Sequence, residues 1–594
     1  QTMTNIRLPL LVATLLALLS TAACQPNPET PVAATSPAQD MAATPDWDGF
    51  VNDYIEAHFV AHPAQAVMMG RHEFDGQLPD WSRGGIETEI ARLKQARADA
   101  VAFPADSLSP EQQFQREYFL AVIDRNLFFI DKSGYPFKNP AFYFDWQLDG
   151  LDPAIYISLE YAPKAQRMQA FTNYLKAIPT AAAQIRENLA MPMARTVLNY
   201  GIASFGGMAE YFEQDVPAIW ADVDDAALQT EFAAANTAAV SAMTELTAWL
   251  KSNTGTATED YALGAELFSQ MIYDTERVNI SLAELEAIGR ADLARNQKAL
   301  AKACAEFAPG KSIPDCYAKM AGRKPEGGPV ASARRQLTEL KAFLIEHDIV
   351  SIPGTEEALV EESPPYARSN SAYINTAGPY ETNMPSTYYI SPPDPSWSPE
   401  VQKAYIPGES DLLFTSVHEV WPGHFLNFVH AARADWIFGR IFVTYAFGEG
   451  WAHYTEEMMY NDGLRDGSPE THIGQLSNAL LRNARFLSAI GLHTKGMSVE
   501  ESKRMFIEEA YQDEGTAIQQ ANRGTYDPAY LNYTMGKLMI RQLRDDWIAS
   551  RGGRKAWREF HDTFLGFGGP PIPLVRAQMM GGDAEAKFYR AAQE

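Results

Sequence analysis

The stretch SVHEVWPGHFLNFVH, residues 416–430, decides how the rest of this sequence is interpreted. His418 and Glu419 are adjacent, as in the metal-binding HExxH motif, but the next histidine, His424, follows the first by six positions instead of four. On a straight helix six residues turn through about 600°, which leaves the two side chains about 120° apart. In that geometry they could not bind one ion.

Pro422 and Gly423 separate the two histidines and offer a way to bring them together. Proline lacks an N–H group and disfavours helical geometry in the residue before it, while glycine can adopt a positive φ. We therefore expect the helix to distort just after Glu419, so that His424 returns to the face of His418. The alternative is a helix that ends before the proline and leaves two unrelated histidines.

A second segment, FGEGWAHYTEEMM at 447–459, carries further candidate ligands. Glu449, His453 and Glu456 are spaced four and three apart, so a helix would present them on one stripe. Catalytic zinc takes three protein ligands and keeps one position for water, and two imidazoles with one carboxylate favour Zn²⁺. We therefore expect a zinc site with one carboxylate from this helix. The alternative is an amphipathic helix whose acids are solvated.

Together the two segments resemble a known family. HEVWPGH followed by GEGWAHYTE is similar to the HExxPGH and GEGWAxYxE motifs of DUF885, uncharacterised bacterial proteins that are themselves similar to zincin metallopeptidases such as the carboxypeptidase Taq group. The resemblance implies His418, His424 and Glu449 as zinc ligands and Glu419 as general base. His453 stands where the family often has an aliphatic residue, so we expect it behind the ligands or on the surface.

The C-terminal third contains two further candidates for catalysis, which match the same family's pattern. Tyr533, in LNYTMGK, would donate a hydrogen bond to the oxygen that gains negative charge during hydrolysis. His493, in GLHTKG, is the other candidate. The alternatives are a core tyrosine and a structural histidine.

Substrate-binding candidates follow if the substrate is a peptide. Arg485 is the first choice for a terminal carboxylate, because a guanidinium binds carboxylates in a bidentate manner; its alternative role is a salt bridge on a helix surface. Tyr388 and Tyr389 lie in the Tyr-rich zone 371–391, which could present an edge strand to a peptide backbone. Alternation suggests that one of them belongs to the core.

Helical periodicity dominates the chain from residue 46 onwards. Apolar residues recur at three- and four-residue spacing in 86–103, 226–252 and 281–303. The zone 371–391 alone has the composition of a hairpin or small sheet. We expect one mainly α domain over 46–594, two-lobed around a cleft, and the family resemblance implies that it is zincin-like.

The N-terminal segment is expected to lie outside this fold. Residues 1–23 contain one basic residue and then an apolar run, which is typical of a signal peptide. Cys24 follows Thr-Ala-Ala as in a bacterial lipobox, so we expect lipidation there, a Pro/Ala/Thr-rich tether over 24–45, and a periplasm-facing lipoprotein, at the outer rather than the inner membrane. An ordinary signal peptide is the alternative.

Cysteine content and charge complete the sequence-based picture. Cys304 and Cys316 are predicted to form a disulfide in an oxidising compartment, with two free thiols as the alternative. The formal net charge is −26, and phosphate binding needs a basic face, so nucleic acid is not an expected partner.

The function expected from these patterns is zinc-dependent hydrolysis of peptide bonds in short peptides, with carboxypeptidase action as one form of it. Two alternatives stay open. One is a metal-dependent amidase acting on a non-standard or cell-wall peptide. The other is a metal-binding lipoprotein without catalysis, which the adjacent acid Glu419 argues against, because a structural metal site has no use for a general base.

Overall fold

The computed structural model describes residues 46–144, 150–363, 371–382, 384–396 and 398–590. The predicted signal peptide, Cys24 and the tether lie outside the described residues. From Asp46 to Glu594 the chain forms one compact unit. It is mainly helical, as predicted.

The first half of this unit contains ten helices in its described residues. They are α1 (Trp47–Ala61), α2 (Pro63–Met68), α3 (Arg83–Ala102), α4 (Pro110–Leu127), α5 (Tyr135–Lys138), α6 (Ala154–Ser158), α7 (Lys164–Asn188), α8 (Arg195–Gln214), α9 (Val216–Trp220) and α10 (Ala226–Ser252). Polar residues cap them where the sequence places one before the periodic run: the Asp225 carboxylate accepts a hydrogen bond from Leu228 N at the start of α10.

The second half carries the candidate site residues. Its helices are α11 (Ala265–Glu276), α12 (Leu282–Phe307), α13 (Ile313–Ala321), α14 (Pro329–Glu346), α15 (Pro399–Tyr405), α16 (Glu409–Glu419), α17 (His424–Ala431), α18 (Ile437–Ile441), α19 (Tyr445–Asn461), α20 (Pro469–Thr494), α21 (Val499–Glu508), α22 (Glu514–Tyr526), α23 (Asn532–Ile548), α24 (Trp557–Gly566) and α25 (Ile572–Met580). The predicted helical segments 86–103, 226–252 and 281–303 correspond to α3, α10 and α12. Cys304 of α12 and Cys316 of α13 form a disulfide.

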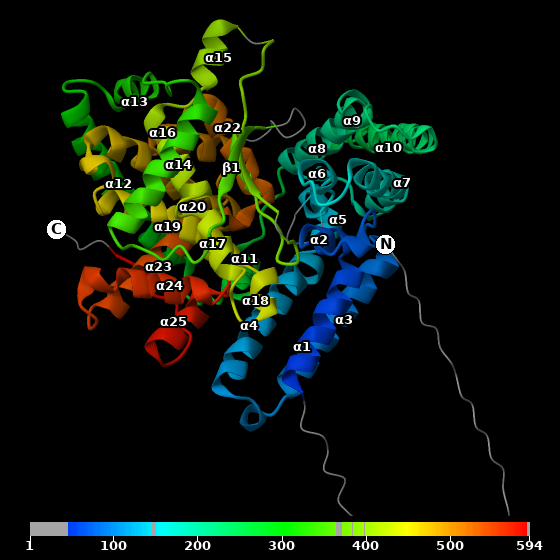
Figure 1. The fold of residues 1–594 in the computed structure, drawn as a ribbon, viewed down its shortest axis with the longest axis horizontal. Coiled ribbons are helices and arrows are strands. Elements are labelled where there is room, and N and C mark those ends of the chain that lie inside the picture. Colours follow the sequence, from blue (N-terminus) through cyan, green and yellow to red (C-terminus); the bar gives the residue numbers. More distant parts are fainter. Residues whose placement is uncertain (1–45, 145–149, 364–370, 383, 397, 591–594) are drawn as a thin grey trace, which may run out of the picture. The chain divides into compact units, whose positions relative to one another are not determined.

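Two hydrophobic cores underlie the two groups of helices in Figure 1. One core is built mainly from α1–α10 and the other from α11–α25 with the sheet. Phe438, Ile441 and Phe442, in and just after α18, pack into the first core although they belong to the second half of the chain. This crossover ties the two groups together.

A three-stranded sheet lies beside the second core, with order β1-β3-β2. It consists of β1 (Ala358–Glu362), β2 (Ala372–Asn375) and β3 (Ser386–Ile390). The antiparallel pair β2–β3 is the predicted hairpin, whereas β1, which pairs with β3 in parallel, was not anticipated. The zone 371–391 therefore contains an edge strand, β2, while Tyr388 and Tyr389 lie on the central strand β3 and not at the sheet edge.

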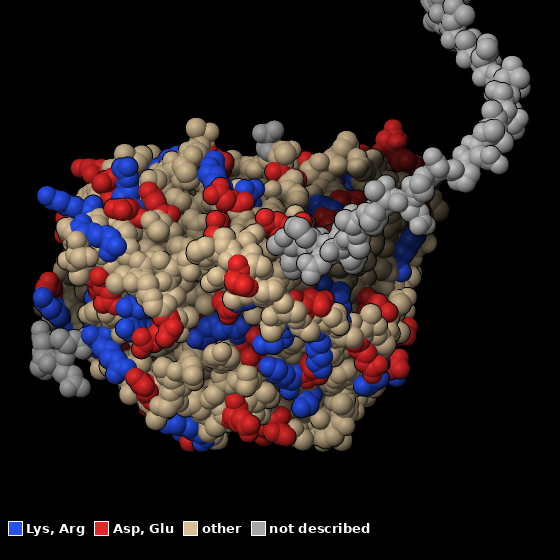
Figure 2. Space-filling view, turned by 90° about the horizontal axis from the view of Figure 1, so that it is seen from below, with Lys and Arg blue, Asp and Glu red and all other residues tan. Residues whose placement is uncertain are grey.

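None of the helices in the described part of the chain has the length and apolarity needed to span a bilayer. On the face in Figure 2, acidic and basic side chains are interspersed rather than gathered into one basic area.

Candidate metal centre

The break between α16 and α17 occurs where the sequence predicts it. α16 ends at Glu419 and α17 begins at His424. Between them the Gly423 amide donates a hydrogen bond to the carbonyl oxygen of Val417 at 2.9 Å, six residues back, which closes a widened turn. The chain therefore turns sharply instead of continuing straight.

Glycine is required at 423 for a different reason from the one expected. Its φ is −71°, so the turn does not use the positive φ that glycine allows. Instead, a β-carbon at this position would lie 1.8 Å from the carbonyl oxygen of His418. The two chain segments approach so closely that only a residue without a side chain fits.

This turn brings the predicted ligands together. His418 Nε2 and His424 Nε2 each lie 3.2 Å from Oε2 of Glu449, which α19 supplies. The two imidazole rings are perpendicular, with centroids 4.8 Å apart. All three potential ligand atoms lie within 4.8 Å of one another, so one ion could contact them all.

Behind the ligands, Glu456 fixes the orientation of His418. His418 Nδ1 lies 2.7 Å from Oε1 of Glu456, so it donates there and leaves Nε2 to face Glu449. The other oxygen of Glu456 accepts from His453 Nδ1 at 3.2 Å. Glu456 and His453 are fully buried. The alternative of solvated acids is therefore wrong for Glu456, and His453 lies behind the ligands rather than among them.

The charges around the two histidines favour a cation at this position. Burial opposes protonation of His418, but hydrogen bonds to Glu449 and Glu456 outweigh it and raise its pKa to about 9. Burial also opposes the charge of Glu449, yet His424 and His418 hold its pKa well below the usual range. Burial alone dominates at His453 and lowers its pKa to about 3.

Glu419 is half-buried and directly follows His418. Its side chain makes no hydrogen bond within the described part of the chain, so its carboxylate is available to a bound molecule.

Tyr388, on β3, is fully buried, with its hydroxyl 3.5 Å from Ser416 Oγ. Tyr389 is only partly buried and stacks on Tyr373 at 5.2 Å. The predicted core tyrosine is therefore Tyr388.

Tyr533 lies at the site, as expected for a donor to a reacting oxygen. Its ring centroid is 6.3 Å from that of His418 and 5.7 Å from that of Tyr445. Burial and the negative charge of Glu449 raise the pKa of Tyr533. Its phenol therefore stays protonated and able to donate.

His493 has structural contacts instead of the expected catalytic ones. Its Nε2 lies 2.7 Å from the carbonyl oxygen of Gly524, and its Nδ1 accepts from Leu263 N at 3.3 Å. The ring also stacks near Phe268. Both nitrogens hold backbone segments together, so neither is free to move a proton.

A second group of potential ligands was not singled out from the sequence. His58 and His62, four residues apart, lie near Glu89. Arg92 donates from Nε and NH2 to the two oxygens of Glu89, both at 2.7 Å. Because a guanidinium already balances this carboxylate, the charges favour the His418 group as the metal centre.

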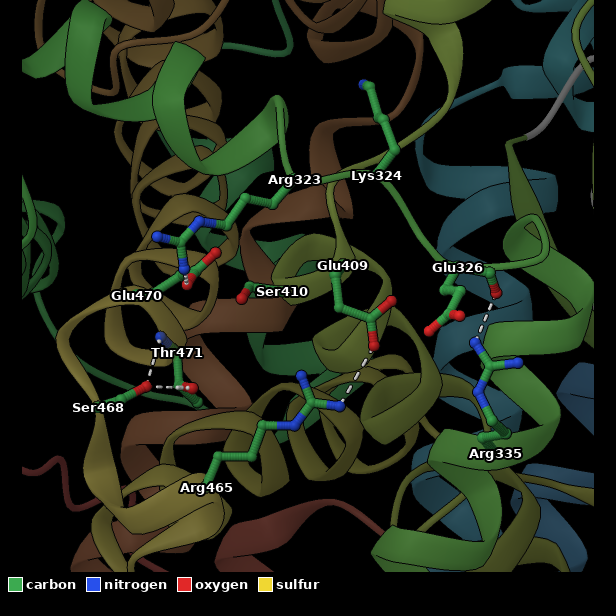
Figure 3. Close-up of a pocket in the computed structure, with 10 residues that line it drawn as sticks. All are labelled: Arg323, Lys324, Glu326, Arg335, Glu409, Ser410, Arg465, Ser468, Glu470 and Thr471. Atoms are coloured by element: carbon green, nitrogen blue, oxygen red, sulfur yellow. Dashed lines mark hydrogen bonds and ion pairs between the residues drawn. The ribbon is translucent and has the colours of Figure 1, made fainter.

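A polar cavity of about 470 Å³ lies at the opposite end of α16 from His418 (Figure 3). Its lining residues are Arg323, Lys324, Glu326, Arg335, Glu409, Ser410, Arg465, Ser468, Glu470 and Thr471. Arg465 pairs with Glu409 at 3.3 Å, and Arg323 pairs with Glu470. The cavity's charges are thus largely matched within the protein, and it supplies no ligand to the His418 group.

Fold and site together define a mainly helical protein whose His-His-Glu group has the donor types that hold a divalent cation. The chain belongs to DUF885, described as a bacterial protein of unknown function, whose model matches residues 63–579.

Two solved structures share the fold. A candidate lipoprotein of unknown function from Shewanella oneidensis has a TM-score of 0.74 and 22% identity, covering 90% of this chain and 100% of its own. A candidate lipoprotein from Colwellia psychrerythraea has a TM-score of 0.76 and 16% identity, covering 90% and 98%. No curated protein matches the chain.

Proposed function

We propose that this protein is a zinc-dependent hydrolase that cleaves peptide bonds in short peptides. The observation that supports it is the convergence of His418, His424 and Glu449. Glu419 follows His418 in sequence, and its side chain makes no hydrogen bond within the described residues. The donor set fits zinc, because two neutral imidazole nitrogens and one carboxylate leave a position open. A zinc ion held there supplies Lewis-acid chemistry, polarising a carbonyl group and lowering the pKa of water.

The protein's own side chains divide the remaining work. Glu419 takes the proton from the attacking water and delivers it to the departing amine nitrogen. Tyr533 donates a hydrogen bond to the carbonyl oxygen as negative charge develops on it. Glu456 keeps the His418 ring in the tautomer whose Nε2 faces Glu449.

We also propose an envelope location, with the domain anchored through a lipid on Cys24. The support is the lipobox-like sequence at the end of an apolar run. The two structural neighbours, described as candidate lipoproteins, agree with it. Labelling with an alkyne fatty acid tests this: Cys24→Ser should abolish label incorporation, and an equally labelled variant would contradict it.

Hydrolysis is tested by incubating the purified protein with a mixture of short peptides and following the products by mass spectrometry. Glu419→Gln should keep the bound metal and slow cleavage by about 100-fold or more, because the general base is lost. Glu508→Gln, on an exposed face of α21, is the matched control and should cleave at the wild-type rate. Undiminished cleavage by Glu419→Gln, or no cleavage of any peptide by the wild type, would contradict the proposal.

A further inference from the structure

Three arginines gather around Tyr533, next to the candidate metal centre. The guanidinium carbons of Arg482 and Arg485, both on α20, lie 5.4 and 4.9 Å from the centre of its ring. Arg523, on α22, donates to the hydroxyl of Tyr445, whose ring packs against Tyr533. Arg482 and Arg485 are buried and Arg523 is partly exposed. Three neighbouring positive charges with so little access to water need anions to balance them.

Two of the three have a carboxylate partner within the protein. Arg482 NH2 lies 3.5 Å from Oε1 of Glu456. Arg523 NH2 lies 2.8 Å from Oδ2 of Asp527, one helical turn away. Their charges are therefore matched before any substrate arrives.

Arg485 differs from both. Its Nε donates to Oε1 of Gln520 at 2.7 Å, and Gln520 is neutral. In the described part of the chain its terminal nitrogens make no hydrogen bond and no carboxylate lies in salt-bridge range. Its exposed fraction is only 8%, which overturns the expected alternative of a salt bridge on a helix surface. Burial and the nearby Arg523 lower the pKa of this guanidinium.

Burying a guanidinium without a carboxylate partner costs free energy. Such an arrangement is suited to binding an anionic ligand, whose negative charge would balance the guanidinium. Here the free atoms are the two parallel N–H groups of a planar fork, which match the two oxygens of a carboxylate. Tyr533 and then His418 connect Arg485 to the candidate metal centre by direct ring contacts. The anion would therefore bind beside the bond to be cleaved.

We infer that Arg485 binds the free α-carboxylate of the substrate, which makes the enzyme a carboxypeptidase. This inference rests on the proposed function. It assigns the substrate class as peptides with an unblocked C-terminus, and Arg485 as the residue that selects them.

Binding tests this without requiring turnover. In zinc-loaded protein carrying Glu419→Gln, calorimetry compares three probes: a short peptide with a free C-terminus, the same peptide amidated, and an amidated peptide ending in Glu. The free acid should bind about 10- to 100-fold more tightly than both amides, since one charge-assisted pair is lost in each. If the Glu amide binds as tightly as the free acid, the ligand is a side-chain carboxylate and the inference is wrong.

Substitutions then assign the preference to one residue. Adding Arg485→Met should make the free acid and its amide bind equally, and Arg485→Lys should restore part of the difference, because it keeps charge without the fork. Arg290→Met, on the surface of α12 and paired with Glu509, is the matched control and should keep the full preference. A preference that survives in both Arg485 variants would overturn the assignment.

Hydrolysis rates separate this inference from the proposed function. If the wild type cleaves free and amidated peptides at equal rates, the protein is a peptidase but Arg485 does not select a C-terminus. If free peptides bind with the expected preference yet none is cleaved, the carboxylate site stands and the hydrolase proposal fails.

Discussion

At His418 a buried carboxylate decides which nitrogen faces the metal position. Glu456 accepts from Nδ1 at 2.7 Å and is itself held by His453 and Arg482. A partner of this kind raises the basicity of an imidazole ligand and limits its rotation. We therefore assign Glu456 an importance close to that of the ligands.

Replacing Glu456 tests this role. Glu456→Gln should weaken zinc affinity by about 10-fold or more, because the amide cannot stabilise the imidazole as a carboxylate does. Competition with a chromophoric chelator measures the affinity. An unchanged dissociation constant would show that Glu456 serves only to pair with Arg482.

Spacing and paired motifs were sufficient to predict that His418, His424 and Glu449 come together. They also predicted that Glu456 lies on the same helix stripe as Glu449. They did not predict its hydrogen bond with His418, because periodicity does not say which neighbouring helix packs against that face. The same limit explains His493, whose two backbone partners come from segments 31 and 230 residues away in sequence. Arg485 shows the limit again, since its burial depends on the packing of α20 against α22 and α23.

Among the elements, glycines set how closely the site-bearing segments approach. Gly450 of α19 and Gly536 of α23 face each other, and a β-carbon on Gly450 would lie 2.5 Å from the α-carbon of Gly536. This close contact between α19 and α23 keeps Glu449, on α19, and Tyr533, on α23, together at the candidate metal centre. The α16–α17 turn depends on Gly423 in the same way.

The turn gives a clear prediction. Gly423→Ala should destabilise the fold by about 3 kcal/mol and abolish zinc binding, because the new β-carbon collides with the His418 carbonyl. Thermal unfolding followed by circular dichroism measures the change.

Gly207→Ala is the matched control, since a β-carbon there meets nothing within 4 Å in the middle of α8. It should stabilise the protein by about 0.5–1 kcal/mol. If both variants melt at the same temperature, the close approach at Gly423 does not constrain the turn.

The sheet shows what local pattern can and cannot predict at this scale. Tyr, Ile and Thr with turn residues between them indicated β2 and β3. β1, with the sequence ALVEE, has one buried position and two consecutive exposed glutamates at its end, which hides any alternation. Strand order depends on long-range pairing, so the central position of β3 could not be predicted.

At the scale of the whole molecule, the chain has two hydrophobic cores, and the disulfide is buried in the second. Cys304 and Cys316 enclose a loop of about a dozen residues. In the chain-entropy model such a link contributes about 3 kcal/mol. The double variant Cys304→Ser/Cys316→Ser should therefore melt at a lower temperature than the oxidised wild type.

Reduction provides the control for this prediction. Wild-type protein treated with a reductant should melt like the double variant, and the variant itself should not respond to reductant. Identical melting of the oxidised wild type and the variant would contradict a stabilising link.

The central claim is that His418, His424 and Glu449 hold one metal ion. Plasma mass spectrometry of the purified protein measures metal per chain, in the wild type, His424→Ala and His62→Ala. We predict about one zinc per chain in the wild type and none in His424→Ala. His62→Ala should keep its zinc, because His62 belongs to the second group, in which Arg92 already pairs with Glu89. Full zinc content in His424→Ala, or its loss in His62→Ala, would contradict the account.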